Sequence, residues 1–225
     1  MSFEALPERL AQVRAEVARL GTQPVTIVAV TKGFGADAVR AALAAGLADV
    51  GENRVQEAVE KQDALRNVTG LRWHLIGHLQ RKKARVVAGR FDLVHSLDSL
   101  ELAQELDRRS ATPQRVLLQV NVAREPQKSG CTPEEARPLV RQVAALGNLR
   151  LEGLMTLAPF TDDVDVQRRT FRDLRVLRDT IKEEEGVWLP TLSMGMSGDY
   201  ATAAREGATV IRLGTALFGP RAETP

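Results

Sequence analysis

Lys32 stands where a lysine can do covalent chemistry, because it directly follows a run of apolar and β-branched residues at 25–31 (VTIVAVT). Such a run is typical of a strand buried on both faces. An amine at the end of this strand would point into a mostly apolar opening at the strand ends. Desolvation there disfavours the ammonium and lowers its pKa. A neutral amine can then form a Schiff base with a carbonyl compound. The alternative is a lysine that lays its stem along the surface and keeps its charge in water.

The chain offers few other lysines, since only six of its 31 basic residues are of this type. The other five occur in polar surroundings of three kinds. These are charged helical faces (Lys61 and Lys182), a basic run (Lys82 and Lys83) and a polar loop (Lys128). Lys32 is therefore the strongest candidate for a reactive amine.

Two segments near the end of the chain have the composition of anion-binding loops, 193–199 (SMGMSGD) and 212–215 (RLGT). Each follows a predicted strand and precedes a predicted helix, where free N–H groups and the helix dipole favour negative charge. Small residues let an anion approach the backbone, and Ser197 and Thr215 add hydroxyl donors. The last two strands of an α/β barrel are a frequent phosphate site. The alternative is two ordinary helix caps.

Arg212 ends the last apolar strand and stays protonated, so it can only donate hydrogen bonds. Beside a heteroaromatic nitrogen it would donate a hydrogen bond without giving up its proton. The alternative is an arginine held at the strand end by a salt bridge.

Other motifs point to no further chemistry. His74 and His78 are four residues apart but straddle a strand end, and the chain has only three histidines and one cysteine, so no metal site is expected. The run at 81–85 (RKKAR) could contact nucleic-acid phosphates, but a solvated helical face is the favoured interpretation. The sequence has no G-x-G-x-x-G, P-loop or G-x-S-x-G motif, so the corresponding nucleotide-binding and hydrolase classes lack support.

The elements that must position these residues alternate along the whole chain. A leading helix at 4–20 is followed by eight short apolar strands, each leading into an amphipathic helix. The predicted strands are 25–31, 48–50, 72–76, 93–95, 115–120, 151–155, 191–193 and 209–212. The predicted helices are 36–45, 54–65, 81–88, 99–109, 133–145 and 165–185, with two more opening near 197 and 215. Eight such units predict a single α/β domain, a closed parallel (β/α)8 TIM barrel with an extra N-terminal helix. An open doubly wound sheet is the alternative.

Composition narrows the class of protein further. A length of 225 residues suits one barrel, and the net charge of +2 argues against a large nucleic-acid or membrane-surface footprint. The lone Cys131 cannot form an internal disulfide, which fits a reducing compartment. The first twenty residues lack the pattern of a signal peptide, and no apolar run approaches the roughly 20 residues that span a bilayer. These features predict a cytoplasmic protein.

Several motifs together resemble the pyridoxal phosphate homeostasis proteins, the PROSC/YggS family of single-domain relatives of the alanine racemase barrel. In chain order from about residue 25 to 219 they are VAVTK, VGENRVQEAVEK, WHLIGHLQRKKAR, VHSLDS, QVNVAREPQKSG, LEGLMTLAP, LSMGMSGDY and VIRLGTALFG. Two departures stand beside these matches. Residues 33–36 (GFGA) lack the proline that often follows the family's lysine, and Lys82 replaces the usual asparagine of LQxNK.

The resemblance implies a fold-type III pyridoxal phosphate barrel over residues 1–225. It implies that Lys32 holds pyridoxal 5'-phosphate as an internal aldimine and that Arg212 faces the pyridine nitrogen. The phosphate-binding positions that it implies are Ser197, Gly214 and Thr215. Asn53, Ser96 and Met155 match motif positions that line the cofactor. It further implies a non-catalytic protein that balances pools of the cofactor and of amino or keto acids, with apo-enzymes as partners. A monomer is expected.

Two other functions use similar residues. A racemase of the same fold type needs a second acid or base opposite the lysine. The resemblance to the racemase family implies that this group would be a tyrosine from the other subunit of a dimer. The only tyrosine here, Tyr200, follows the predicted phosphate loop. A Schiff-base aldolase acting on a sugar phosphate would share the lysine and the phosphate corner, but the flanking motifs do not match one.

Overall fold

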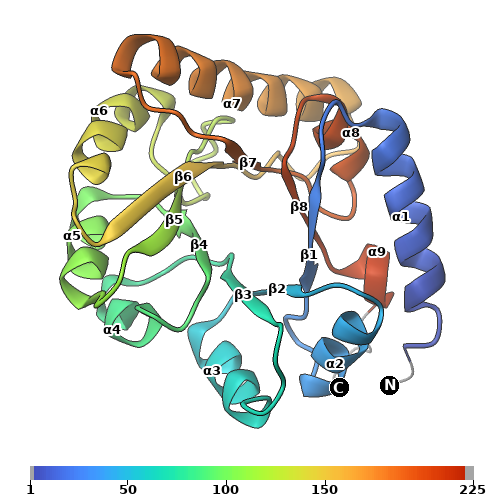
Figure 1. Ribbon diagram of the computed structural model, residues 1–225. Helices are drawn as coiled ribbons and strands as arrows, with labels where there is room; N and C mark the ends of the chain where they lie inside the picture. The colour runs from blue at the N-terminus through green and yellow to red at the C-terminus, as the bar shows by residue number, and fades with distance from the viewer. Residues whose placement is uncertain (1–2, 221–225) are drawn as a thin grey trace.

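A closed barrel of eight parallel strands forms the centre of the protein, in the order β1 to β8 around the ring (Figure 1). The computed structural model describes residues 3–220. The strands are β1 (Thr26–Val30), β2 (Asp49–Glu52), β3 (Arg72–Leu75), β4 (Leu93–Leu97), β5 (Gln114–Gln119), β6 (Leu149–Met155), β7 (Thr191–Ser193) and β8 (Val210–Leu213). The predicted TIM barrel is therefore confirmed, and the open doubly wound sheet is wrong because β1 pairs with β8.

Helices cover the outside of the barrel (Figure 1). They are α1 (Leu6–Leu20), α2 (Ala36–Ala44), α3 (Val55–Ala64), the 3-10 turn η1 (Arg81–Lys83), α4 (Ala84–Val87), α5 (Leu100–Arg109), α6 (Pro133–Ala144), α7 (Val164–Glu185), α8 (Tyr200–Arg205) and α9 (Thr215–Phe218). Two helices begin at a side-chain N-cap: the Ser99 side chain accepts from the backbone of α5, and Thr132 forms a capping box with Glu135 on α6.

Two predicted helices differ from those observed. Residues 81–88 form a 3-10 turn and one short helical turn, and Gly89 follows at a φ of 75°, in the left-handed region that ends helices. The helix expected near Ser197 begins at Tyr200 instead. The Asp199 carboxylate accepts from the Met196 backbone N–H at 2.5 Å, which holds the preceding residues in a turn. Ser197 is thereby placed on a loop.

The strands alternate between an outer and an inner face. Outward side chains such as Ala29, Val50 and Leu213 belong to the main hydrophobic core, which packs the helices onto the barrel. Leu93 and Met155 belong to a separate small apolar cluster, completed by Leu117. Much of the remaining interior is polar, with Asp49, His74, His95, Ser193 and Arg212 all buried. No helix within residues 3–220 is long and apolar enough to cross a membrane.

Gly153 marks the closest approach of β6 and β7, since a Cβ there would overlap the backbone oxygen of its partner Thr191. We predict that Gly153→Ala lowers the free energy of unfolding by about 1–3 kcal/mol, the usual cost of overpacking. Gly147→Ala is the matched control, because its Cβ would have no neighbour within 4 Å. Urea denaturation of both variants checks this, and equal midpoints would contradict the close approach.

Candidate functional site

A cavity of about 740 Å³ opens at the carboxyl ends of the strands, the end where barrel enzymes place their sites. Loops that follow strands from both halves of the chain contribute to its wall. Six of the eight predicted site residues line it: Lys32, Asn53, Ser197, Arg212, Gly214 and Thr215. The barrel therefore brings together the amine, the arginine and the hydroxyl groups that the sequence singles out.

Lys32 lies half-buried two residues beyond the end of β1, and its backbone neighbours are held on both sides. The Lys61 ammonium donates to the Thr31 carbonyl at 2.7 Å, and the Gly33 N–H donates to Glu57 Oε1 at 2.6 Å. Both anchoring groups belong to α3. The helix that follows β2 thus fixes the backbone that carries the candidate nucleophile.

Lys61 lies inside the protein, which corrects the prediction of a charged helical face. Its side chain is 6% exposed and forms ion pairs with Glu52 at 2.7 Å and Glu57 at 2.9 Å. Burial opposes ionisation of Glu57, but the hydrogen bonds from Lys61 and from the Gly33 N–H outweigh it and lower the pKa. The i,i+4 spacing of Glu57 and Lys61 is the sequence signal for this pair. Lys61 is buried because it pairs with Glu52 on β2, and the helical pattern does not reveal that partner.

Arg212 reaches the cavity from β8 with only 3% of its surface exposed. Its guanidinium donates from Nη1 to Ser193 Oγ at 2.6 Å and from Nη2 to the Thr156 carbonyl at 3.0 Å. These partners are a hydroxyl and a carbonyl, unlike the salt bridge considered from sequence. Burial lowers the pKa of Arg212 to about 10, against the opposing charge of Asp199, so the side chain remains a cation at neutral pH.

Ser197 joins the two loops of the predicted phosphate corner. Its Oγ accepts from the backbone N–H of Gly214 at 3.2 Å and of Ala216 at 3.1 Å. Because the oxygen accepts twice, its hydroxyl hydrogen is left to donate to a third group. Asp199 also lines this corner, and burial raises the pKa of its carboxyl despite the Met196 N–H and the charge of Arg212.

The remaining predicted residues lie away from the cavity wall. Ser96 on β4 is fully buried, and its hydroxyl has no hydrogen-bond partner among residues 3–220. Met155 at the end of β6 is fully buried against the apolar cluster with Leu93 and Leu117. Their contact with a cofactor stays a prediction.

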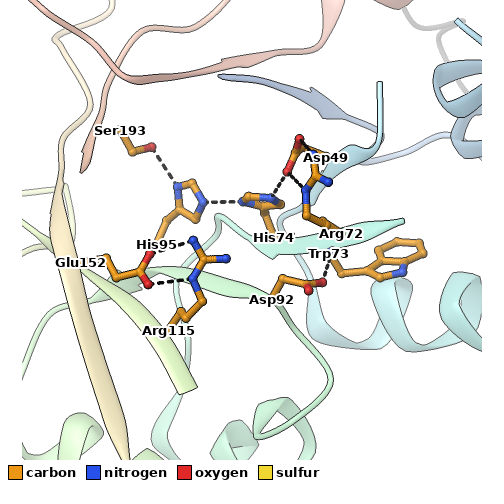
Figure 2. A network of polar contacts seen from close by, with 9 residues as sticks. All are labelled: Asp49, Arg72, Trp73, His74, Asp92, His95, Arg115, Glu152 and Ser193. Atoms are coloured by element: carbon orange, nitrogen blue, oxygen red, sulfur yellow. Dashed lines mark hydrogen bonds and ion pairs between the residues drawn. The ribbon is translucent and has the colours of Figure 1, made fainter. Parts of the chain in front are cut away.

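A buried polar network that the sequence motifs did not reveal occupies the barrel interior (Figure 2), and Arg212 joins it through Ser193. His74 and His95 contact each other at 2.9 Å between Nδ1 and Nε2. His78, four residues after His74 in the sequence, lines the cavity instead and pairs with Asp98 at 3.3 Å. Within residues 3–220 no group of three or more potential ligands could hold a metal ion.

The chain has relatives of known name and structure. Residues 2–222 match the family described as "Alanine racemase, N-terminal domain". A pyridoxal phosphate homeostasis protein of Pseudomonas aeruginosa is 44% identical over 223 residues, 97% of this chain and 95% of that protein. PipY of Synechococcus elongatus, in a structure with PLP bound, gives a TM-score of 0.86 at 39% identity, covering 95% of this chain and 100% of that chain. An alanine racemase of Clostridium difficile has the same fold, with a TM-score of 0.78 at 18% identity over 96% of this chain but 58% of that chain.

The burial of Lys61 gives a test of the anchor beneath Lys32. We predict that Lys61→Met lowers the free energy of unfolding by about 3–5 kcal/mol, because Glu52 and Glu57 lose their buried partner. Lys82→Met is the control, since Lys82 is exposed and such substitutions change stability by about 0.5 kcal/mol or less. Urea denaturation measures both. Equal stability of the two variants would show that Lys61 is not a structural ion-pair partner.

Proposed function

The chain belongs to the alanine racemase N-terminal domain family, among the pyridoxal phosphate homeostasis proteins, and we propose that it binds pyridoxal 5'-phosphate and serves its homeostasis without significant catalytic turnover. The observation that carries the proposal is the donor set of the 740 Å³ cavity. An amine, a buried arginine and hydroxyl groups beside backbone N–H groups line one space. Pyridoxal phosphate offers the matching acceptors: an aldehyde, a pyridine nitrogen and a phosphate.

Each part of the cofactor has a residue to hold it. Lys32 would hold the aldehyde carbon, and Arg212 would donate to the pyridine nitrogen. The phosphate would lie at the corner of Ser197, Gly214 and Thr215, where Ser197 still has a hydroxyl hydrogen to donate. Asn53 lines the same cavity, and we assign Ser96 and Met155 to the layer beneath it.

Two features favour a carrier over an enzyme. When bound, pyridoxal phosphate supplies an aldehyde that condenses with amines and a ring that withdraws electrons most strongly when its nitrogen is protonated. Arg212, with a pKa of about 10, donates a hydrogen bond there and keeps its proton. The Tyr200 hydroxyl bonds Glu16 on α1, outside the barrel, so this tyrosine does not supply the second acid or base of a racemase.

We propose a monomer as the functional unit, since this chain alone supplies the amine, the arginine and the hydroxyl groups proposed to hold the cofactor. As partners we propose the cofactor itself, apo-enzymes that receive it, and amino or keto acids that exchange with it. The aldehyde chemistry supports the last class, because amino acids carry the amine that competes with Lys32.

We predict that added pyridoxal phosphate gives the protein a visible absorbance band and that borohydride reduction leaves the cofactor on Lys32. Peptide mapping by mass spectrometry locates it, and this matters because Lys128 lines the same cavity. Lys32→Ala removes the band, whereas the remote control Lys182→Ala keeps it. An unchanged spectrum on adding the cofactor would contradict the proposed function, and attachment to Lys128 would contradict the assignment of Lys32.

A second measurement separates carrier from racemase. The loaded protein is incubated with L-alanine in deuterated water, and proton exchange at the α-carbon is followed by NMR. We predict exchange no faster than that caused by free pyridoxal phosphate at the same concentration. Tyr200 is not part of the cavity wall and so cannot act as the second base, and the ring nitrogen beside Arg212 stays unprotonated. Fast exchange with accumulation of D-alanine would favour the racemase instead.

A further inference from the structure

A chain of hydrogen bonds crosses the barrel interior from Asp49 to Ser193 (Figure 2) and continues from Ser193 to Arg212. We call four of its members the barrel relay: Asp49, His74, His95 and Ser193, from β2, β3, β4 and β7. His74 Nε2 lies 3.0 Å from Asp49 Oδ1, and His74 Nδ1 lies 2.9 Å from His95 Nε2. His95 Nδ1 lies 2.8 Å from Ser193 Oγ, which accepts from Arg212 at 2.6 Å.

The barrel relay joins two cavities at opposite mouths of the barrel. Arg212 lines the candidate cofactor cavity, whereas Asp49 and Arg72 line a second cavity of about 610 Å³ that also contacts α1. His95 and Ser193 are fully buried, while the Arg72 side chain is 52% exposed. Protons from solvent can therefore reach the histidine pair from the end that Asp49 occupies.

The charges along the barrel relay fix the direction of its hydrogen bonds. Burial disfavours the Asp49 carboxylate, but hydrogen bonds from His74 and Arg72 outweigh this and hold its pKa well below the usual range. Asp49 is thus an acceptor, and His74 must carry a hydrogen on Nε2. Burial, with the charges of His74 and Arg212, lowers the pKa of His95 well below its usual value, so His95 is neutral and carries one hydrogen.

Two hydrogen arrangements satisfy every contact. With His74 neutral, its Nδ1 accepts from His95 Nε2, His95 Nδ1 accepts from the Ser193 hydroxyl, and Ser193 Oγ accepts from Arg212. With one proton added to His74, its Nδ1 donates to His95 Nε2, and the His95 hydrogen moves to Nδ1. Ser193 Oγ then accepts from both His95 and Arg212, and its hydroxyl hydrogen no longer points to His95. One proton at His74 therefore reverses two hydrogen bonds and redirects the hydroxyl hydrogen of Ser193, the group to which Arg212 donates.

Other charged groups around the histidine pair already have hydrogen-bond or ion-pair partners. Arg115 on β5 bonds Glu152 on β6 at 2.7 and 2.8 Å, beside His95. Asp92 accepts from the Trp73 backbone N–H at 2.7 Å, and Arg72 bonds Asp49. Arg212 faces the pair from β8 through Ser193. Within residues 3–220, Asp49 is the carboxylate in direct contact with His74, so a proton on His74 is stabilised mainly by that residue.

We propose that the barrel relay positions Arg212, and that its direction reverses when His74 takes up one proton. The inference rests on the proposed function, in which Arg212 is the partner of the pyridine nitrogen. His74, His95 and Ser193 are positioning residues in this proposal. The electronic environment of the bound cofactor becomes sensitive to protons at the far mouth, the end of the barrel where Asp49 lies.

Ring-nitrogen NMR tests the reversal directly, because the chain has only three histidines. We expect His95 to carry its hydrogen on Nε2 at high pH and on Nδ1 at low pH, with the midpoint at which His74 gains its proton. His78, 53% exposed and paired with Asp98, is the internal control, and no linked change of its tautomer is expected. A His95 tautomer that stays the same over the whole pH range in which the protein is folded overturns the proposal.

Two substitutions at the far mouth move this midpoint in opposite directions. Asp49→Asn removes the anion beside His74 and lowers the midpoint by about one pH unit or more. Arg72→Gln removes a cation that competes for Asp49 and raises it. A purely structural role predicts no such opposite shifts. Midpoints that stay unchanged, or that move in the same direction, overturn the proposal, and Arg72→Gln alone decides if Asp49→Asn does not fold.

Ser193→Ala disconnects Arg212 from the histidines. In the wild type, the side-chain N–H resonances of Arg212 follow the His95 midpoint, and so does the absorbance of the protein loaded with pyridoxal phosphate. In Ser193→Ala the His95 change remains while both Arg212 and the absorbance stop following it. Arg212 signals that still track pH in this variant overturn the proposal. The Arg212 readout needs no cofactor, so a failure to bind pyridoxal phosphate would contradict the proposed function while leaving this test intact.

Discussion

The pairing of the first strand with the last is the contact on which the candidate site depends. Val28 on β1 lies opposite Arg212 on β8, and Ala29 opposite Leu213. This register places Lys32, just beyond β1, at the same mouth as Gly214 and the phosphate corner. Groups nearly two hundred residues apart in the chain therefore meet in one cavity, and either one alone would be an ordinary strand end.

The same closure forces polar groups into the barrel, where each must find a partner. Arg212 is nearly fully buried and is stabilised by a hydroxyl and a carbonyl in place of a carboxylate. Lys61 is equally buried but pairs with two carboxylates. The two cations therefore differ in what they can still bind. A cation with neutral partners can donate to a further acceptor, whereas a cation between two anions serves to stabilise the fold.

Much of this arrangement could be predicted from the sequence. Alternating blocks indicated the eight strands, and the strand-end rule of α/β barrels pointed to Lys32, Ser197 and Arg212. The burial of Lys61 escaped prediction because Glu52, its main partner, lies on a different element and leaves no trace in the helical periodicity. The histidine pair escaped it as well. β3 has only four residues, too few for alternation to show which way His74 points, and its contact with His95 spans two strands.

The leading helix has a consequence for how the molecule is made. Arg9 on α1 donates to the Leu217 carbonyl on α9, a separation of 208 residues, and α1 packs against both α8 and α9. Contacts so distant in sequence form slowly, because the intervening chain must lose its freedom before they stabilise anything. During synthesis from the N-terminus, β1 cannot pair with β8 until almost the whole chain has left the ribosome. The binding cavity is lined by residues of both strands, so it is the last part of the protein to be completed.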